Sequence, residues 1–320
     1  MTGLGMLGYP SIDVALDARP PEMVSVAPEL WDLLRLAYDG GARASEFETA
    51  WANGRAFLQA PDALRGRRPV IVEWKGSHRA PGDEVAPIDL RVDHVFLVSC
   101  KYLSRIMINA SPAHLFERLL QGGHGIRGGD WYAEVAPESY QALYESVRPA
   151  VPGLPADVTD LRVPDRRALS GALREGWPSG TESLYARLAR DVAQATAARW
   201  QAQLSAGSSP ESMLWRILRM GSAPYFVLGA SPAAPLLLRV ATPWDWRRHY
   251  RLVRFAPTVQ DGGQPRVGWT AEVEDRHSGE TRTIDGHVEV RWSHGRFGGN
   301  PEAKVYLDTP HARVPGYFPL

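Results

Sequence analysis

The chain of 320 residues carries 36 basic and 36 acidic side chains, so its formal net charge at neutral pH is zero. This balance argues against a polybasic protein that wraps nucleic acid, but it is compatible with a local basic cleft. No apolar run is long enough to cross a membrane, and the N-terminus does not have the pattern of a secretory signal. The single cysteine, Cys100, excludes an internal disulfide, and we therefore expect a cytoplasmic protein with no membrane partner.

Apolar spacing and turn signals divide the chain into four expected regions. They are an irregular N-terminal arm at 1–26, a core at 27–121, a helical region at 122–222 and a β-rich region at 223–320. The core is expected to begin with two helices, at 28–38 and 45–58. The predicted fold class is α/β, with a mixed sheet flanked by helices, a helical insertion and a β-rich C-terminal portion.

Three strands are expected after these helices, at 69–76, 87–92 and 95–102. Because side chains alternate along a strand, Glu73 and Lys75 should share one face of the first strand. Ser99 and Lys101 should likewise share one face of the third strand. Cys100 then points to the opposite face, which favours a small buried hydrophobic residue over a nucleophile.

Lysine is rare in this chain. Only three of the 36 basic residues are lysines, namely Lys75, Lys101 and Lys304, and the rest are arginines. A lysine retained in such a background indicates a need for a compact, mobile charge with a tunable pKa, although chance retention is the alternative. All three lysines lie on apparent strands.

An acid and a lysine occur at a spacing that suits phosphodiester cleavage. Asp89 follows a proline, and an apolar strand then leads to Lys101. A divalent cation held by one or two carboxylates can neutralise phosphoryl charge, and a nearby lysine can orient water. Adjacent antiparallel strands would bring these groups together.

Two short segments carry a resemblance to a known superfamily. Pro87-Ile88-Asp89 and, nine residues later, Ser99-Cys100-Lys101 resemble the PD-(D/E)xK nuclease signature, with serine at the position of the second acid. The chain is most similar to the HaeIII-type restriction endonucleases. The matching segments are Phe47-Glu48, Asp89-Leu90-Arg91, Leu97 to Lys101, and the strand pair at 288–294 and 301–305.

The resemblance implies a restriction-endonuclease-like fold and a Mg²⁺- or Mn²⁺-dependent endonuclease that cuts DNA in restriction or phage defence, as a homodimer if both strands are cut. Asp89 and Glu73 would bind the metal, with Glu73 supplying the charge that Ser99 lacks. Lys101 would position the attacking water. Glu48 would hold a second water or metal, unless it forms a capping box with Ser45.

Three alternatives stay open at this point. A second frame, Pro61-Asp62 followed after ten residues by Glu73-Trp74-Lys75, matches the signature literally but leaves little room for a strand that could hold Asp62. RNA is a possible substrate at the same site. The chain could also be a non-catalytic DNA-binding or partner subunit in which Ser99 marks a lost acid.

Several cations and polar side chains are candidates for nucleic-acid contacts, because arginine can grip guanine or phosphate with two hydrogen bonds. The alternative is a strand-turn-strand whose polar groups bond to one another. The segment from Trp244 to Arg251, followed by Arg254, mixes arginines with aromatic residues and fits a nucleic-acid surface and an ordinary arginine-rich strand equally well. The candidates are Arg91, Arg105, Asn109, Arg291, His294, Arg296 and Lys304.

Overall fold

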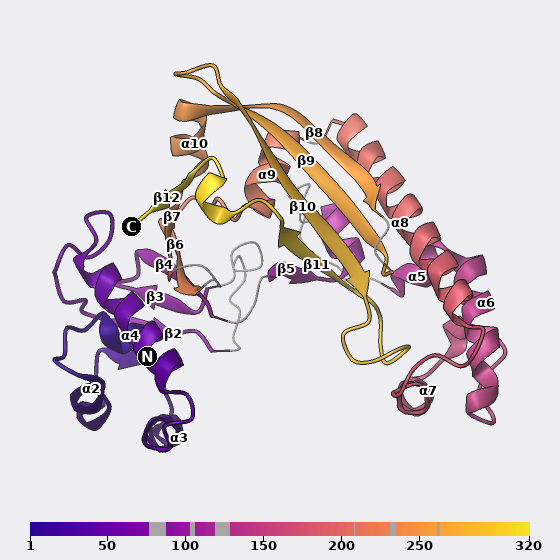
Figure 1. Cartoon of the computed structure of the whole chain (residues 1–320), viewed down its shortest axis with the longest axis horizontal. Coiled ribbons are helices and arrows are strands. Elements are labelled where there is room, and N and C mark those ends of the chain that lie inside the picture. The colour runs from indigo at the N-terminus through magenta and orange to yellow at the C-terminus, as the bar shows by residue number, and fades with distance from the viewer. Residues whose placement is uncertain (77–87, 103–105, 119–128, 208, 231–234, 261–262) are drawn as a thin grey trace. The chain divides into compact units, whose positions relative to one another are not determined.

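The computed structural model describes residues 1–76, 88–102, 106–118, 129–207, 209–230, 235–260 and 263–320 (Figure 1). Its α-helices are α1 Thr2–Gly5, α2 Ile12–Ala18, α3 Pro28–Asp39, α4 Ala44–Gln59, α5 Trp131–Val135, α6 Pro137–Val147, α7 Val163–Ala172, α8 Glu182–Ser205, α9 Pro210–Ile217 and α10 Pro243–His249. Its strands are β1 Met23–Val24, β2 Val72–Trp74, β3 Leu90–Val92, β4 Phe96–Lys101, β5 Ile106–Ala110, β6 Tyr225–Ala230, β7 Pro235–Val240, β8 Tyr250–Gln260, β9 Arg266–Asp275, β10 Thr281–Arg291, β11 Glu302–Leu307 and β12 Tyr317–Pro319.

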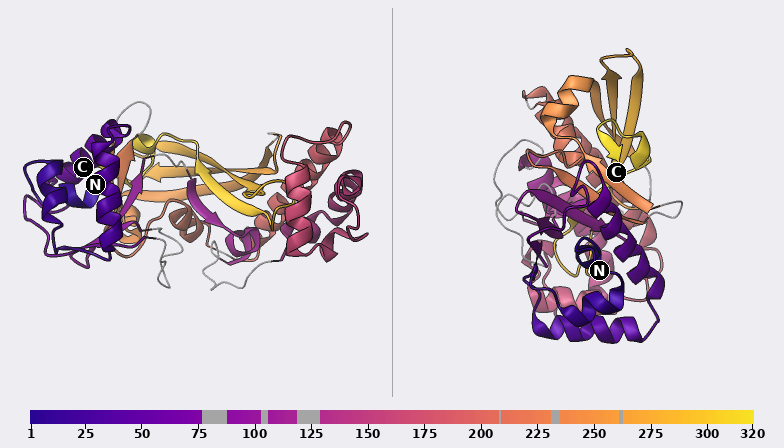
Figure 2. Two further views of the ribbon diagram at one scale, coloured as in Figure 1. Left: turned by 90° about the horizontal axis from the view of Figure 1, so that it is seen from below. Right: turned by 90° about the vertical axis from the view of Figure 1, so that its left-hand side faces the viewer.

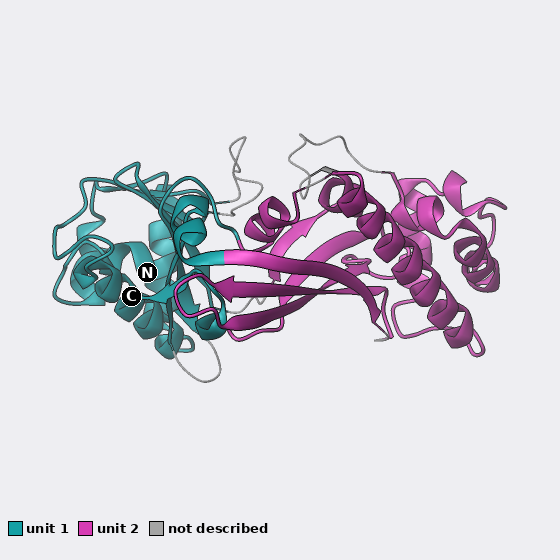
Figure 3. Ribbon diagram, turned by 90° about the horizontal axis from the view of Figure 1, so that it is seen from above, with its two compact units in different colours: residues 1–105, 219–250, 311–320 teal, residues 106–218, 251–310 magenta. Residues whose placement is uncertain are grey.

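The chain forms two compact units, and each unit is assembled from separate segments (Figure 3). Unit 1 contains residues 1–105, 219–250 and 311–320, and unit 2 contains residues 106–218 and 251–310. This division differs from the four consecutive regions expected from sequence. The expected helical region belongs to unit 2 apart from residues 219–222, whereas the β-rich region is shared between both units.

Unit 1 is built on a mixed sheet with the strand order β1-β2-β3-β4-β6-β7-β12. Strands β2, β3 and β4 pair antiparallel, whereas β4 pairs parallel with β6. Two parallel neighbours need a long connection. Here the connection is the first segment of unit 2. The expectation of a mixed α/β sheet flanked by helices is confirmed.

The core of unit 1 lies between one face of this sheet and helices α1 to α4 (Figures 1 and 2). Val72, Val92 and Val98 are completely buried on that face. The rings of Phe57 on α4 and Phe226 on β6 meet edge to face, with centroids 5.0 Å apart. Burial of these alternating apolar residues fixes which face of each strand is left for polar side chains.

The expectation of an irregular N-terminal arm is wrong. Residues 1–26 contain α1 and α2, and Ser11 caps α2 by accepting a hydrogen bond from the amide of Val14 at 3.3 Å. Leu4 and Leu16 are almost fully buried in the core of unit 1. The helices are too short to give a clear period in the sequence, and packing against α4 and the sheet stabilises them.

The chain reverses at Asp93-His94, between the expected strands at 87–92 and 95–102, and the conformation of this turn is unusual. Both residues have positive φ angles, 50° and 60°, which asparagine, aspartate and glycine adopt most readily. The carboxylate of Asp93 accepts hydrogen bonds from the amides of Val70 and Ile71, at 2.7 and 3.2 Å. These bonds tie the turn between β3 and β4 to the entry of β2.

Unit 2 is built on a second sheet with the order β5-β11-β10-β9-β8. The long helix α8 runs along this sheet and contacts β9 (Figures 1 and 2). Phe116, Trp131 and Trp200 pack together between them, with Phe116 centroids 6.0 and 5.3 Å from the two indoles. Of the segment from Trp244 to Arg254, the residues up to His249 lie in the short helix α10, and Tyr250 to Arg254 lie in strand β8.

Within the described residues, no helix is both long enough and apolar enough to cross a bilayer.

Candidate functional site

Four of the predicted catalytic residues of unit 1 lie on neighbouring strands or directly beside one: Glu73 on β2, Asp89 just before β3, and Ser99 and Lys101 on β4. Glu73 on β2 is opposite Arg91 on β3, and the amide of Lys75 bonds to the carbonyl of Asp89 at 3.0 Å. On the other side, the amide of Asp89 bonds to the carbonyl of Val98 at 2.9 Å. Strand alternation therefore directs these polar side chains away from the helix-covered face.

Asp89 lies immediately before β3 and uses its side chain to extend the pairing with β4. Its Oδ2 accepts hydrogen bonds from the hydroxyl of Ser99, at 3.2 Å, and from the amide of Cys100, at 2.6 Å. Ser99, at the position where the signature would have an acid, is fully buried. Ser99 thus holds the carboxylate of Asp89 by a hydrogen bond.

Glu73 is held in an ion-paired cluster. Its Oε1 is 3.2 Å from Nζ of Lys75, and its Oε2 accepts a hydrogen bond from Nε of Arg91 at 2.7 Å. Burial alone would raise the pKa of Glu73, but the hydrogen bonds and charges of Lys75 and Arg91 hold its pKa below the ordinary value. Glu73 is therefore ionised and partly neutralised at physiological pH.

Lys101 is half-buried at the end of β4, where it pairs with Gly229 of β6. Asp89 lies beside Ser99 on the neighbouring strand β4. Lys101 is therefore the diagonal neighbour of Asp89 on β4, and Glu73 is the diagonal neighbour of Asp89 on β2. Diagonal pairs in a sheet are about 7–8 Å apart. The sheet therefore places Glu73, Asp89, Ser99 and Lys101 on one face, with Asp89 between Glu73, toward the C-terminal end of β3, and Lys101, toward its N-terminal end.

Cys100 points toward the core, as predicted. It packs against the buried cluster of unit 1. Burial, with a contribution from the nearby charge of Asp89, raises the pKa of its thiol to about 12. A thiol with this pKa has almost no thiolate at neutral pH and is a poor nucleophile.

Glu48 is separate from this group. It is exposed on α4, the helix that packs on the opposite face of the sheet, and its charge acts on Tyr38. The alternative capping box is also wrong, because Arg43 precedes the first turn of α4 and no side chain caps the helix. The helix begins one residue earlier than expected, which places Ser45 inside it.

The second signature frame is not assembled. Asp62 is exposed beyond the end of α4, and its Oδ2 accepts a hydrogen bond from Nε of Arg239 at 3.1 Å. Arg239 lies on β7, which is separated from β2 by β3, β4 and β6 in the sheet. Asp62 is thus anchored far along the sheet from Glu73 and Lys75.

The predicted nucleic-acid contacts fall in different places. Arg91 belongs to the Glu73 cluster of unit 1, and Arg105 lies outside the described residues. In unit 2, Asn109 on β5 lies opposite Lys304 on β11, whose Nζ is 3.6 Å from the carboxylate of Glu302. Asn109 and Lys304 do not line the pocket described next, whereas Arg291, His294 and Arg296 do.

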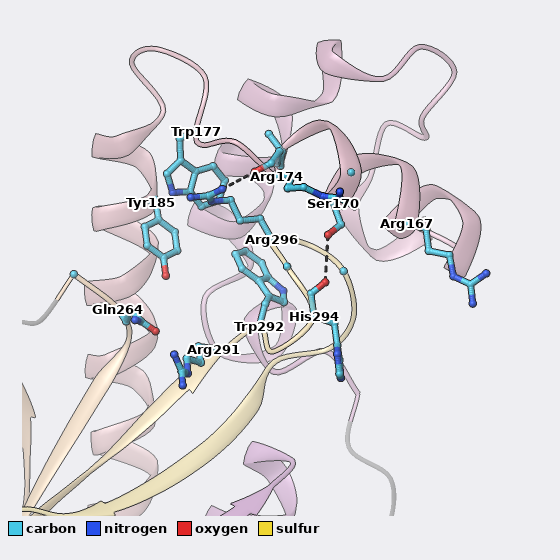
Figure 4. Close-up of a pocket in the computed structure, with 15 residues that line it drawn as sticks. Arg167, Ser170, Arg174, Trp177, Tyr185, Gln264, Arg291, Trp292, His294 and Arg296 are labelled. Carbon is cyan, nitrogen blue, oxygen red and sulfur yellow. Dashed lines mark hydrogen bonds between the residues drawn. The ribbon is translucent and has the colours of Figure 1, made fainter. Parts of the chain in front are cut away.

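Arg291, His294 and Arg296 line one pocket of unit 2, with a volume of about 790 Å³ (Figure 4). Residues from α7, the start of α8 and the loop between β10 and β11 surround it. The other lining residues are Arg167, Ser170, Gly171, Leu173, Arg174, Trp177, Tyr185, Gly263, Gln264, Trp292, Gly295 and Gly298.

The pocket residues from α7 and α8 were missed by sequence reasoning. Arg174 and Trp177 lie in the connection between α7 and α8, and Tyr185 lies in the first turns of α8. The sequence feature that indicates this part of the pocket is a tryptophan between glycine and proline in a polar loop, at Gly176-Trp177-Pro178. Such an aromatic residue is often placed for binding and not for a core.

The described residues contain no group of three or more His, Cys, Asp or Glu side chains that could share a metal ion. Comparison of the chain with protein-family models, with curated proteins and with solved structures found no match.

Proposed function

We propose that this protein is a metal-dependent endonuclease that hydrolyses phosphodiester bonds of DNA. The observation that supports it most is that Glu73, Asp89, Ser99 and Lys101 share one face of the sheet at β2, β3 and β4, with Asp89 beside Ser99 and between Glu73 and Lys101. An acid and a lysine on adjacent strands are the arrangement expected from the resemblance to PD-(D/E)xK nucleases. A restriction or defence role, and a homodimer that cuts both strands, belong to the same proposal.

The residues of this face fit a divalent cation of the Mg²⁺ type. Asp89 and Glu73 offer carboxylate oxygens, and the hydrogen bonds to Asp89 among the described residues all reach Oδ2 and leave Oδ1. Mg²⁺ keeps several waters and needs only one or two carboxylates, so a larger acidic group is not required. When bound, Mg²⁺ or Mn²⁺ would supply neutralisation of charge on the phosphoryl oxygens.

The other side chains of the face have complementary roles in this proposal. Lys101 orients the attacking water and stabilises the negative charge that develops during the reaction. Arg91 is 38% exposed at the edge of the Glu73 cluster, so it can turn from Glu73 to a phosphate. Ser99 keeps the Asp89 carboxylate in place by hydrogen bonding.

The proposal is tested by nicking and linearisation of a supercoiled plasmid with Mg²⁺ or Mn²⁺. We expect cleavage by the wild-type protein and a loss of about 100-fold or more in Lys101→Met and Asp89→Asn. Asp89→Asn keeps an oxygen that can accept from the Cys100 amide, so the fold should be retained. Asp62→Ala removes a carboxylate outside the site and should cleave like wild type.

Two outcomes would overturn the proposal: cleavage that survives both substitutions, and no cleavage of DNA with either metal by folded protein. The side chains of the site do not discriminate between DNA and RNA. A parallel assay with single-stranded RNA therefore shows which of the two nucleic acids is cut.

A non-catalytic DNA-binding or partner subunit is the second candidate. It is favoured by the pairing of Glu73 with both Lys75 and Arg91, which already neutralises the second carboxylate. It is also favoured by Ser99 at the position of an acid. DNA affinity without cleavage under any metal would support this candidate over the enzyme.

A further inference from the structure

The pocket of unit 2 is strongly cationic. Four arginines and His294 line it, and among the residues that the structure describes no aspartate or glutamate does (Figure 4). Arg167 and Arg174 are exposed and have no ion pair with any of the described residues. Two of the other lining residues lie near carboxylates, with Nε of Arg291 3.3 Å from Glu289 and Nε2 of His294 3.9 Å from Glu302. A pocket with this charge favours an anionic ligand.

Aromatic rings form the wall beside these cations. The centroids of Trp177 and Tyr185 are 5.0 Å apart, and Tyr185 stacks on Trp292 with centroids 6.4 Å apart. The guanidinium of Arg296 lies over the Trp177 ring at 4.9 Å and donates a hydrogen bond to the carbonyl of Leu173. Flat rings and a flat guanidinium together suit a planar ligand group.

One polar atom of this wall is unsatisfied. The indole N–H of Trp292 is buried and has no hydrogen-bond partner among the described residues. A buried donor without a partner costs about 1–3 kcal/mol, and such atoms are often found where a ligand or water binds. The side-chain amide of Gln264 also lines the pocket and offers both a donor and an acceptor.

We propose that this pocket binds one nucleotide of a nucleic acid, with its base against Trp177 and Tyr185 and its phosphate on Arg174, while Arg167, which lies beyond Ser170 and His294 and points away from the rings, meets a neighbouring phosphate (Figure 4). The volume of about 790 Å³ lies within the usual range of about 300–1,000 Å³ for small-molecule sites. A paired base inside a duplex cannot enter such a pocket, so the nucleotide comes from a single strand or is extruded from a duplex. The same chemistry would accept a free nucleotide, and the experiment separates these sources.

The inference extends the proposed action on nucleic acid but does not depend on cleavage. All of its residues belong to unit 2, whereas the proposed catalytic face belongs to unit 1. Binding is therefore measured with EDTA and without divalent metal, so that failure of the nuclease proposal and failure of the pocket proposal give different results.

The test is fluorescence anisotropy of the full chain with a labelled oligothymidylate of about twelve nucleotides, a usual site size for single-strand binders. The comparison probe is a chain of abasic sugar phosphates of equal length and charge. We expect wild type to bind the oligothymidylate about tenfold more tightly than the abasic chain, because base stacking on aromatic rings adds affinity. We expect Trp177→Ala to remove this preference, and Trp177→Phe to keep most of it.

The second part of the test reverses the charge of exposed arginines, and substitution of these residues should not disturb the fold. Arg167→Glu and Arg174→Glu, made as two single variants, should each weaken binding of both probes about tenfold, because a phosphate loses its cation. Arg190→Glu is the matched control, since Arg190 is an exposed arginine on α8 outside the pocket and makes the same charge change. Thermal melting of each variant shows whether it has folded.

The outcomes decide between the ligands. Equal wild-type affinity for the two probes, or pocket variants that bind like Arg190→Glu, would overturn the proposal. Thymidine monophosphate could displace the labelled oligothymidylate at the same concentration as unlabelled oligothymidylate does. This result would support a nucleotide site but overturn its use on a strand. Weak displacement by the monophosphate, with base-dependent binding of the strand, is the expected result.

Discussion

Glu73 shows how one side chain combines stability with a proposed chemical role. Its carboxylate contacts Lys75 on the same strand and Arg91 on the neighbouring strand. The three side chains fix the polar face of β2 and β3 in one arrangement. If the face binds a metal and a phosphate, the phosphate replaces the carboxylate as the partner of Arg91.

The first prediction is that Glu73→Gln lowers the free energy of unfolding by about 1 kcal/mol near neutral pH. The value is modest because Arg91 is 38% exposed and solvent screens its ion pair. The folded-state pKa of Glu73 is below its ordinary value, so its stabilisation is present above the unfolded pKa of about 4.3. It is lost as the pH falls through the folded-state pKa.

Urea unfolding of wild type and Glu73→Gln between about pH 3 and pH 7 measures this effect, over the range that contains the unfolded pKa. The difference between the two proteins should shrink as the pH falls below about 4.3. A difference that is constant with pH would show that the loss of stability comes from packing and not from the charge of Glu73.

At the scale of elements, α1 and α4 approach each other more closely than side chains allow. A Cβ on Gly54 of α4 would lie 2.1 Å from the carbonyl oxygen of Thr2 and 2.9 Å from Cα of Gly5. A Cβ on Gly5 would lie 2.3 Å from the carbonyl oxygen of Trp51. Glycine at both positions therefore lets the N-terminal helix lie directly on the backbone of α4.

We predict that Gly54→Ala destabilises the protein by about 1–3 kcal/mol, the usual cost of overpacking, although alanine is the better helix former. Gly221→Ala is the matched control in unit 1, because nothing lies within 4 Å of its added methyl group. Thermal and urea unfolding of the two variants make the comparison. Equal stability would mean that α1 moves away from α4 at little cost.

At the scale of the whole molecule, the chain passes between the units four times, after residues 105, 218, 250 and 310. The last segment returns to unit 1, where β12 pairs with β7. In this segment Val314 and Tyr317 are buried, and the carbonyl of Pro315 accepts a hydrogen bond from Nε1 of Trp246 at 3.1 Å. The C-terminal residues therefore complete a sheet that begins near the N-terminus.

We predict that removal of residues 311–320 lowers the free energy of unfolding by about 3–5 kcal/mol. The loss comes from the buried side chains of Val314 and Tyr317 and from the indole N–H of Trp246, which loses its hydrogen-bond acceptor. Tyr317→Ala should show a smaller loss in the same direction. Chemical denaturation of the truncated and full-length proteins checks this. A truncated protein as stable as the full chain would indicate that the segment contributes little to unit 1.

The sequence by itself determined the elements that have a strong period. The helices at 28–38 and 45–58 follow from local spacing, and the structure confirms them to within one residue at each end. The alternation that places Glu73 with Lys75, and Cys100 in the core, also follows from local spacing and is confirmed. It also led to Arg291, His294 and Arg296, which share one pocket. These features depend on neighbours in the chain, and so they can be read from it.

Only the tertiary structure decided the relations between distant segments. Asp62 and Glu48 fit the motifs by spacing, but burial of apolar faces places Glu48 on the outside of α4, and an ion pair holds Asp62 beside β7. The order of strands, the interleaving of the two units and the meeting of Trp177 with Trp292 depend on contacts far apart in sequence. Local spacing carries no information on which buried faces pack together, and that packing assembles both candidate sites.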